Sequence, residues 1–393
     1  MIFVNDLAGA SPQIVPAWMR HYQGKSGMTF VDLVFPAFLF VVGMSIPFAL
    51  GSRLTQGESL WKTLAHVAVR TFSLLSVGIL MVNGTPSSEK MGWSGTWWSV
   101  LMYCSAILAF STVSLPRPTN PAAGLGQARH LVFLALRVIG LVGLIWLALT
   151  FRGHNGERIV SFDPFSIRTS WYGILGLIGW AYLVGSLVFL AFRVRRTALL
   201  GCQALLLCLY PAARTGIFKD FWLGHYVGIG DTLGALPSIA VGGMLLATIL
   251  LTPDTATSAS RVRFTLLFAA GCAAGAGLLT GLYGINKNSA TPAWCLWACA
   301  ITAALWLLFH WAANMQRVSW VVRPFVIAGE NVLLAYLLSG MLPSLIDLAH
   351  LGDFYGHLAG PYLGCAIARS AGCGVAVLAV TAGLNRLGFR LKL

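Results

Sequence analysis

Long apolar runs separated by short polar segments make up most of this chain. Eleven runs are long enough to cross a bilayer, which takes about 17 to 25 residues each. In lipid a backbone must satisfy its own hydrogen bonds, so runs of this kind are typical of transmembrane helices. The pattern predicts an all-α, polytopic transmembrane helix bundle with spans at 28–50, 63–83, 96–115, 131–151, 171–193, 198–214, 231–252, 264–284, 294–314, 324–347 and 362–384.

The first ten residues, MIFVNDLAGA, resemble the outer end of a further helix. Met1 opens directly on apolar sequence without a charged leader, so we expect a truncated first helix in addition to the eleven complete spans. No segment between the runs is long enough for a separate soluble domain. We therefore expect a single transmembrane domain over residues 1–393.

Composition and charge agree with a membrane location. Hydrophobic residues form 57% of the chain and charged residues only 10%, which excludes an ordinary soluble domain. The net charge of +14 could suggest nucleic acid, but the basic residues are dispersed over short loops, fourteen in one alternating set and eight in the other. The positive-inside rule assigns the first set to the cytoplasm. We expect a multi-pass membrane protein with no nucleic-acid partner.

Three polar residues near the N-terminus stand out. Asp32 opens an apolar run, where an acid is costly unless it is paired or functional. His21 lies eleven positions earlier in a short loop, so both side chains could face one cavity mouth, with the imidazole exchanging a proton and the carboxylate orienting it. A solvated histidine beside a capping aspartate is the alternative. Asn5 either hydrogen-bonds a carbonyl or sugar hydroxyl or caps its helix.

Two arginines and one polar pair are candidates for contacts with a cofactor. Arg70 and Arg137 lie one to two turns inside helices that start at the predicted cytoplasmic side, where they could bind phosphate or simply snorkel to water. Glu330 and Asn331 fall within a predicted span and could line a cavity. Alternatively, they form a structural pair with a buried arginine such as Arg369.

Polar residues at helix junctions are candidates for substrate contacts. Asp231 begins a predicted helix and either caps its amides or binds substrate. The cluster Asn286, Lys287 and Asn288 could bind sugar hydroxyls or a carboxylate, or anchor its helix at the interface. The chain has no HExxH or CxxC motif, and we predict no metal site.

Glycines also suggest how the helices pack. Two GxxxG spacings fall in the run at 264–284, and small residues at this spacing let helix backbones approach closely in lipid. The glycines concerned are Gly271, Gly275, Gly277 and Gly281.

Several segments together resemble one known family, that of heparan-α-glucosaminide N-acetyltransferase and its bacterial relatives of DUF5009 type. They are MIFVN at 1–5, His21, GMTFVDLVFPAFLFVVGMSIPF at 27–48, WYGILGLIGWAYL at 171–183, GDTLGALPSIAVGGM at 230–244, INKN at 285–288 and GENVLLAYLL at 329–338. The resemblance implies a helical membrane enzyme that takes acetyl-CoA from the cytosol and acetylates a glucosamine amine on the far side. It implies that His21 is the catalytic base or acetyl relay, with Asn5 as a positioning partner and Asp32 as its support.

The sequence leaves two functions open. The first is transfer of acetyl from acetyl-CoA, as co-substrate, to an amino sugar or glycan acceptor outside the cytoplasm. The alternative is an amino-sugar (N-acetylglucosamine) transporter, because Pro36, Gly43, Pro47 and Pro237 could break helices at a binding site. The expected partners are the lipid bilayer and the acceptor, and a homodimer remains open beside a monomer.

Overall fold

The computed structural model describes residues 1–11, 13–113, 123–252, 257–313, 325–326 and 329–391. This part of the chain is almost entirely helical, which confirms the predicted all-α bundle. It divides into two compact units, each described by itself below. Unit 1 comprises Met1–Pro16, Ile79–Trp171 and Gln316–Leu393, and unit 2 comprises Ala17–Gly78 and Tyr172–Met315. The single domain over 1–393 stays a prediction.

The predicted spans match helices closely. Within the described residues, nine helices are long and apolar enough to cross a membrane. The two other predicted spans, 96–115 and 324–347, overlap the shorter apolar helices Gly95–Phe110 and Val332–Leu348 within the described residues. The chain is therefore a multi-pass membrane protein in a lipid bilayer.

Unit 2 contains η1 and two long helices in its first segment and seven further elements after residue 172. Its α3 runs on into unit 1 at residue 79. The elements are η1 (Ala17–Met19), α2 (Phe30–Thr55), α3 (Leu60–Val82), α7 (Gly173–Phe192), α8 (Arg196–Arg214), η2 (Trp222–His225), η3 (Asp231–Ala235), α9 (Leu236–Leu251), α10 (Ser258–Tyr283) and α11 (Pro292–Ala313).

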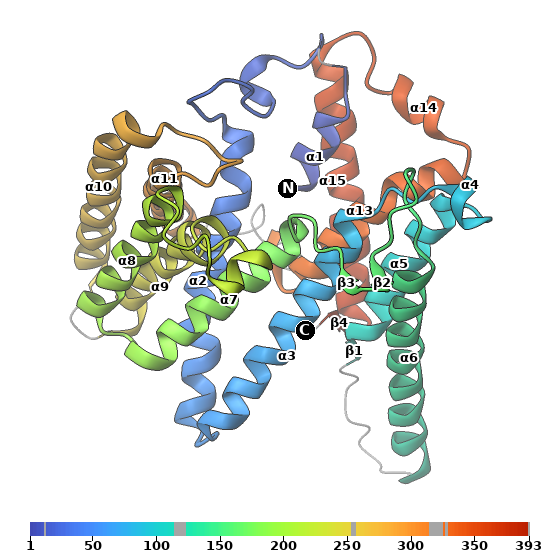
Figure 1. Cartoon of the computed structure of the whole chain (residues 1–393), viewed down its shortest axis with the longest axis horizontal. Coiled ribbons are helices and arrows are strands. Elements are labelled where there is room, and N and C mark those ends of the chain that lie inside the picture. The colour runs from blue at the N-terminus through green and yellow to red at the C-terminus, as the bar shows by residue number, and fades with distance from the viewer. Residues whose placement is uncertain (12, 114–122, 253–256, 314–324, 327–328, 392–393) are drawn as a thin grey trace. The chain divides into compact units, whose positions relative to one another are not determined.

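Helix α9 is the centre of unit 2. It packs against α2, α7, α8 and α11, as Figure 1 shows, and 89% of its span is buried. Its sequence is apolar on every side, as expected of a helix enclosed by others. The one-turn π-helix η3 leads into it, and Pro237 lies in its first turn, where a missing N–H costs nothing.

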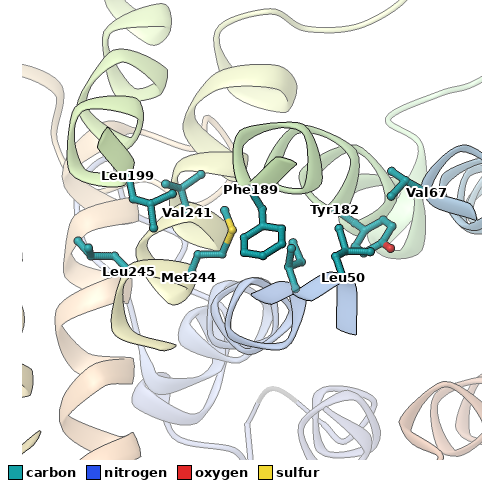
Figure 2. Close-up of a cluster of buried hydrophobic side chains, with 9 residues drawn as sticks. Leu50, Val67, Tyr182, Phe189, Leu199, Val241, Met244 and Leu245 are labelled. Atoms are coloured by element: carbon teal, nitrogen blue, oxygen red, sulfur yellow. The ribbon is translucent and has the colours of Figure 1, made fainter. Parts of the chain in front are cut away.

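Buried side chains join α2, α3, α7, α8 and α9. Figure 2 shows the Phe189 ring of α7 between Met244 of α9 and Leu50 of α2, with Tyr182 and Val67 nearby. Lipid tails are as apolar as these side chains, so van der Waals packing rather than exclusion from water holds such helices together.

Two glycines allow α2 and α9 to cross at backbone contact. A Cβ on Gly43 would lie 1.9 Å from the carbonyl oxygen of Ala240, and one on Gly243 would lie 2.0 Å from that of Phe40. Helix α10 packs along α11, but of its four GxxxG glycines only Gly275 lies at a close contact with described residues. A Cβ there would lie 3.2 Å from Leu296 Cδ1, whereas one on Gly271, Gly277 or Gly281 would meet nothing within 4 Å.

The prolines of α2 also behave differently from expectation. The helix continues from Phe30 to Thr55 through both Pro36 and Pro47. In membrane helices neighbouring groups can satisfy the backbone that proline frees. The helix break considered at these two positions is therefore wrong.

Unit 1 combines four long helices with short connecting elements. They are α1 (Ile2–Ala8), α4 (Ser88–Met91), α5 (Gly95–Phe110), β1 (Ser111–Val113), α6 (Ala123–Thr150), β2 (Val160–Phe162), β3 (Phe165–Ile167), α13 (Val332–Leu348), α14 (Gly352–His357), α15 (Leu363–Arg386) and β4 (Phe389–Leu391).

Contacts in unit 1 bring the two ends of the described chain together. Helix α1 packs on α15, α13 packs on α5 and α15, and α5 packs on α6. Strands β1 and β4 pair antiparallel with Thr112 opposite Arg390, and β2 pairs with β3 in a hairpin. Asn5 lies in α1 and is therefore held beside α15.

Candidate functional site

The start of α2 is organised by Asp32. Thr29 precedes the first helical residue, and its N–H donates to Asp32 Oδ2 over 3.1 Å. The Thr29 hydroxyl donates to the Arg20 carbonyl oxygen over 2.7 Å. A threonine followed three residues later by an acid is a typical helix-start signature, and the acid here satisfies a backbone donor.

The same carboxylate binds the loop before the helix. The N–H of Tyr22 donates to Asp32 Oδ2 over 3.0 Å, while Oδ1 lies 2.8 Å from Nδ1 of His21. Asp32 is only 3% exposed, so backbone and imidazole donors replace the water that it loses. The predicted approach of His21 to Asp32 is present in the structure.

This contact decides how His21 can react. The ionised carboxylate accepts, so Nδ1 carries the hydrogen and the neutral ring keeps its lone pair on Nε2. The His21 side chain is 43% exposed, and an incoming molecule can therefore reach it. An imidazole oriented by a buried carboxylate through Nδ1 is suited to accept a proton on Nε2.

Lys287 completes the group. Its Nζ lies 3.1 Å from His21 Nδ1 and 3.7 Å from Asp32 Oδ1. Nδ1 cannot donate to Asp32 and also accept from Lys287, so the ammonium acts mainly as a charge beside the carboxylate. Burial lowers the pKa of Lys287, and the charge of Asp32 opposes this shift.

A hydrogen-bonded connection holds the Lys287 loop against the His21 loop. The N–H of Gly27 donates to the carbonyl oxygen of Ile285 over 2.8 Å, and the N–H of Ile285 donates to the Ser26 hydroxyl over 2.9 Å. Because both loops are joined in this way, Lys287 reaches the start of α2 from the far end of α10.

Asn286 and Asn288 flank Lys287 in its loop, and Asp231 lies elsewhere in unit 2. Asn286 Oδ1 accepts the N–H of Ser289 over 3.0 Å within the loop, and Asn288 is exposed. Asp231 begins η3, where its Oδ1 accepts the N–H of Thr232 over 2.7 Å. The capping alternative for Asp231 is thus present, and only Lys287 of the four joins His21 and Asp32.

The four residues predicted to bind the cofactor are divided between the units, with Arg70 in unit 2 and Arg137, Glu330 and Asn331 in unit 1. In unit 2 the Arg70 guanidinium lies 4.6 Å from the centre of the Tyr182 ring, and its Nε has no hydrogen-bond partner among the described residues. In unit 1 the Nε of Arg137 donates to the Ser111 carbonyl oxygen over 2.9 Å and so supports β1.

Glu330 and Asn331 lie before α13 and not inside a span, which corrects their expected placement. Glu330 is exposed and pairs with Arg390 over 3.3 Å instead of with Arg369. Asn331 is buried, donates to the Phe389 carbonyl oxygen over 3.1 Å and accepts the Leu391 N–H over 3.1 Å. Asn331 therefore holds β4 in place.

Asn5 belongs to unit 1, where it lines a cavity of about 530 Å³. Its neighbour Asp6 is the residue that the sequence analysis missed. Asp6 Oδ1 accepts the Tyr355 hydroxyl over 2.6 Å, and Oδ2 accepts the Ser370 hydroxyl over 2.6 Å and Arg369 Nε over 3.2 Å. Two lone charges of opposite sign in separate apolar segments, Asp6 and Arg369, were the available signal.

Comparison with known proteins agrees with the motifs of the N-terminal region. Residues 2–114 match the family described as "Domain of unknown function (DUF5009)". Human heparan-alpha-glucosaminide N-acetyltransferase is 34% identical over 93 residues, which cover 24% of this chain and 13% of that protein. The mouse protein of the same name is 33% identical over the same lengths. The chain thus matches about an eighth of these relatives. The resemblance predicted from the sequence is confirmed: residues 2–114 are similar to DUF5009, and 93 residues of the chain are similar to heparan-alpha-glucosaminide N-acetyltransferase.

Proposed function

We propose that this protein is a transmembrane acetyltransferase that moves an acetyl group from cytosolic acetyl-CoA to the amine of a glucosamine-type sugar outside the cytoplasm. The observation that carries the proposal is the 2.8 Å contact between His21 and the buried Asp32, with Lys287 beside them. His21 and Asp32 lie within residues 2–114, which match DUF5009, and 93 residues of the chain are similar to the human acetyltransferase. The bacterial inner membrane is the location we propose.

The chemistry needs one base and one acid at the same place. His21 Nε2 takes a proton from the acceptor amine as the nitrogen attacks the thioester carbonyl. The tetrahedral intermediate then expels the CoA thiolate, which takes the proton back from the imidazolium. The products are free CoA thiol and the acetylated amine. A positioned base contributes about 10² to 10⁴ in rate.

The resemblance also allows a covalent route. In that route Nε2 attacks the thioester and the CoA thiolate leaves, which gives an acetyl-imidazolium that keeps its Nδ1 hydrogen beside Asp32. The amine then attacks the acetyl group, His21 returns to its neutral form, and the proton that the amine loses goes to the thiolate. Asp32 supports the imidazolium in both routes. Asn5 is proposed as a positioning partner on the strength of the resemblance alone.

The donor needs an anion site for its phosphates. Arg70 is the strongest candidate among the described residues, because its Nε has no partner and its guanidinium lies over the Tyr182 ring. A guanidinium binds phosphate well because its donors match phosphate geometry. Arg137, Glu330 and Asn331 are already engaged with β1 and β4 and are weaker candidates.

A direct assay tests the proposal. The full chain, purified in detergent, receives labelled acetyl-CoA and glucosamine, and acetylated sugar is measured. His225→Ala, which changes an exposed histidine of the same unit, is the matched control. Product that disappears in His21→Ala and persists in the control supports the proposal. Sugar uptake into vesicles without acetyl-CoA, with no acetylated product, would favour the transporter.

A further inference from the structure

The cavity of unit 1 has the size of a small-molecule site. Its volume of about 530 Å³ falls within the usual range of roughly 300 to 1,000 Å³ for ligand pockets. Helices α1, α5, α13, α14 and α15 all contribute to its wall, together with Met81 from the end of α3. Apolar side chains such as Ile2, Leu342 and Ile346 form much of that wall.

On one side of the cavity the polar side chains already have protein partners. Asp6 receives the hydroxyls of Tyr355 and Ser370 and the guanidinium of Arg369, whose side chain is only 6% exposed. Burial, followed by the neighbouring Asp6, raises the pKa of Tyr355, so its hydroxyl remains a donor. Asp6 and Arg369 cancel in charge, and this side serves as a rigid neutral wall.

The other side offers groups without protein partners. The carboxylate of Asp347 and the hydroxyls of Tyr103 and Tyr336 line the cavity, as does the Asn5 amide. Among the described residues, none of these four side chains has a hydrogen-bond or ion-pair partner. Asp347 is exposed near the end of α13, so its carboxylate is open to an incoming cation.

The charges select the class of ligand. With Asp6 and Arg369 paired, Asp347 leaves the cavity with one uncompensated negative charge. A monocation restores neutrality, and tyrosine rings add attraction for a cation placed over their faces. The Tyr103 and Tyr336 hydroxyls and the Asn5 amide can both donate to and accept from hydroxyl groups.

We propose that the unit 1 cavity is a binding site for a small hydroxylated amine in its protonated form, with Asp347 as the counter-ion of the ammonium group. The identification of that amine as an amino sugar rests on the proposed function, whereas the ammonium site does not. The negative charge also explains selectivity, because the uncharged acetylated product lacks the group that Asp347 recognises.

Binding measured without acetyl-CoA tests the site independently of catalysis. Calorimetry on the full chain in detergent compares glucosamine with N-acetylglucosamine at a pH that keeps the amine protonated. Asp347→Asn is expected to weaken glucosamine binding at least tenfold and to change N-acetylglucosamine binding less than threefold. Asp353→Asn, an exposed acid of the neighbouring α14 that does not line the cavity, is the control and should leave both unchanged.

The outcomes separate this inference from the proposed function. Equal losses for both sugars in Asp347→Asn, unchanged glucosamine binding, or an equal loss in Asp353→Asn would overturn the ammonium site. Selective loss in Asp347→Asn supports it even if no acetyl transfer is found. Conversely, acetyl transfer that depends on His21 but has an unchanged KM for glucosamine in Asp347→Asn would leave the proposed function standing and remove this site.

Discussion

Asp32→Asn tests how the carboxylate controls His21. The substitution keeps the side-chain volume and removes the charge, and it replaces one acceptor oxygen by an NH2 donor. Oδ2 serves the backbone N–H groups of Tyr22 and Thr29, so the amide oxygen takes that position. The NH2 group then faces His21 Nδ1. That nitrogen must become the acceptor, and the ring hydrogen moves to Nε2.

The expected loss of activity follows from the change of tautomer. In a serine protease triad, the same change of tautomer lowers kcat by about 10⁴. His21 depends on Asp32 through one 2.8 Å contact, so we expect a fall in kcat of about 10³ to 10⁴ with KM for acetyl-CoA changed less than about threefold. Loss of a charge-assisted hydrogen bond should also lower stability by about 1.5 to 3 kcal/mol.

Two measurements check this prediction. Acetyl transfer gives kcat and KM, and thermal unfolding in detergent gives stability. Asp220→Asn, an exposed acid in a loop of the same unit, is the control. If Asp32→Asn still folds and keeps more than about a tenth of wild-type kcat, the role assigned to the carboxylate is refuted.

Two further predictions concern packing and charge in unit 2. Gly43→Ala places a Cβ against the Ala240 carbonyl and should lower the free energy of unfolding by about 1 to 3 kcal/mol or more. Gly271→Ala places its Cβ in open space and should leave that free energy unchanged or raise it by up to about 1 kcal/mol. Chemical unfolding measures both variants, and equal effects would refute the close crossing. Burial lowers the pKa of Lys287 below its usual 10.5, so the folded state releases this proton at a lower pH than the unfolded state does. The stability of the wild-type protein should therefore rise as the pH approaches 10.5, and this rise should be absent in Lys287→Met. The difference in melting temperature between the two proteins across that range measures it, and a constant difference would contradict the stated cause.

The resemblance was readable in the sequence because its motifs are local. TFVD carries a helix-start pattern, and its acid had to find a partner within reach of the apolar run. The loop histidine eleven positions earlier was near enough to be proposed as that partner, and the structure joins the two. Asn331 shows the limit of such reasoning: its place in an apolar run suggested a cavity, but its amide holds a strand formed by the last described residues.

The apolar runs by themselves determined the helices and the membrane class, because lipid forces each segment to satisfy its own backbone. Tertiary structure alone decided which helices meet. Lys287 reaches His21 across 266 positions, and Arg369 reaches Asp6 across 363. Glycine spacing suggested close packing of α10, where only Gly275 meets a neighbouring side chain among the described residues, but it did not indicate the crossing of α2 and α9, where Gly43 and Gly243 face carbonyl oxygens. A sequence period reports which face of a helix is small or apolar, but the partner of that face depends on packing along the whole chain.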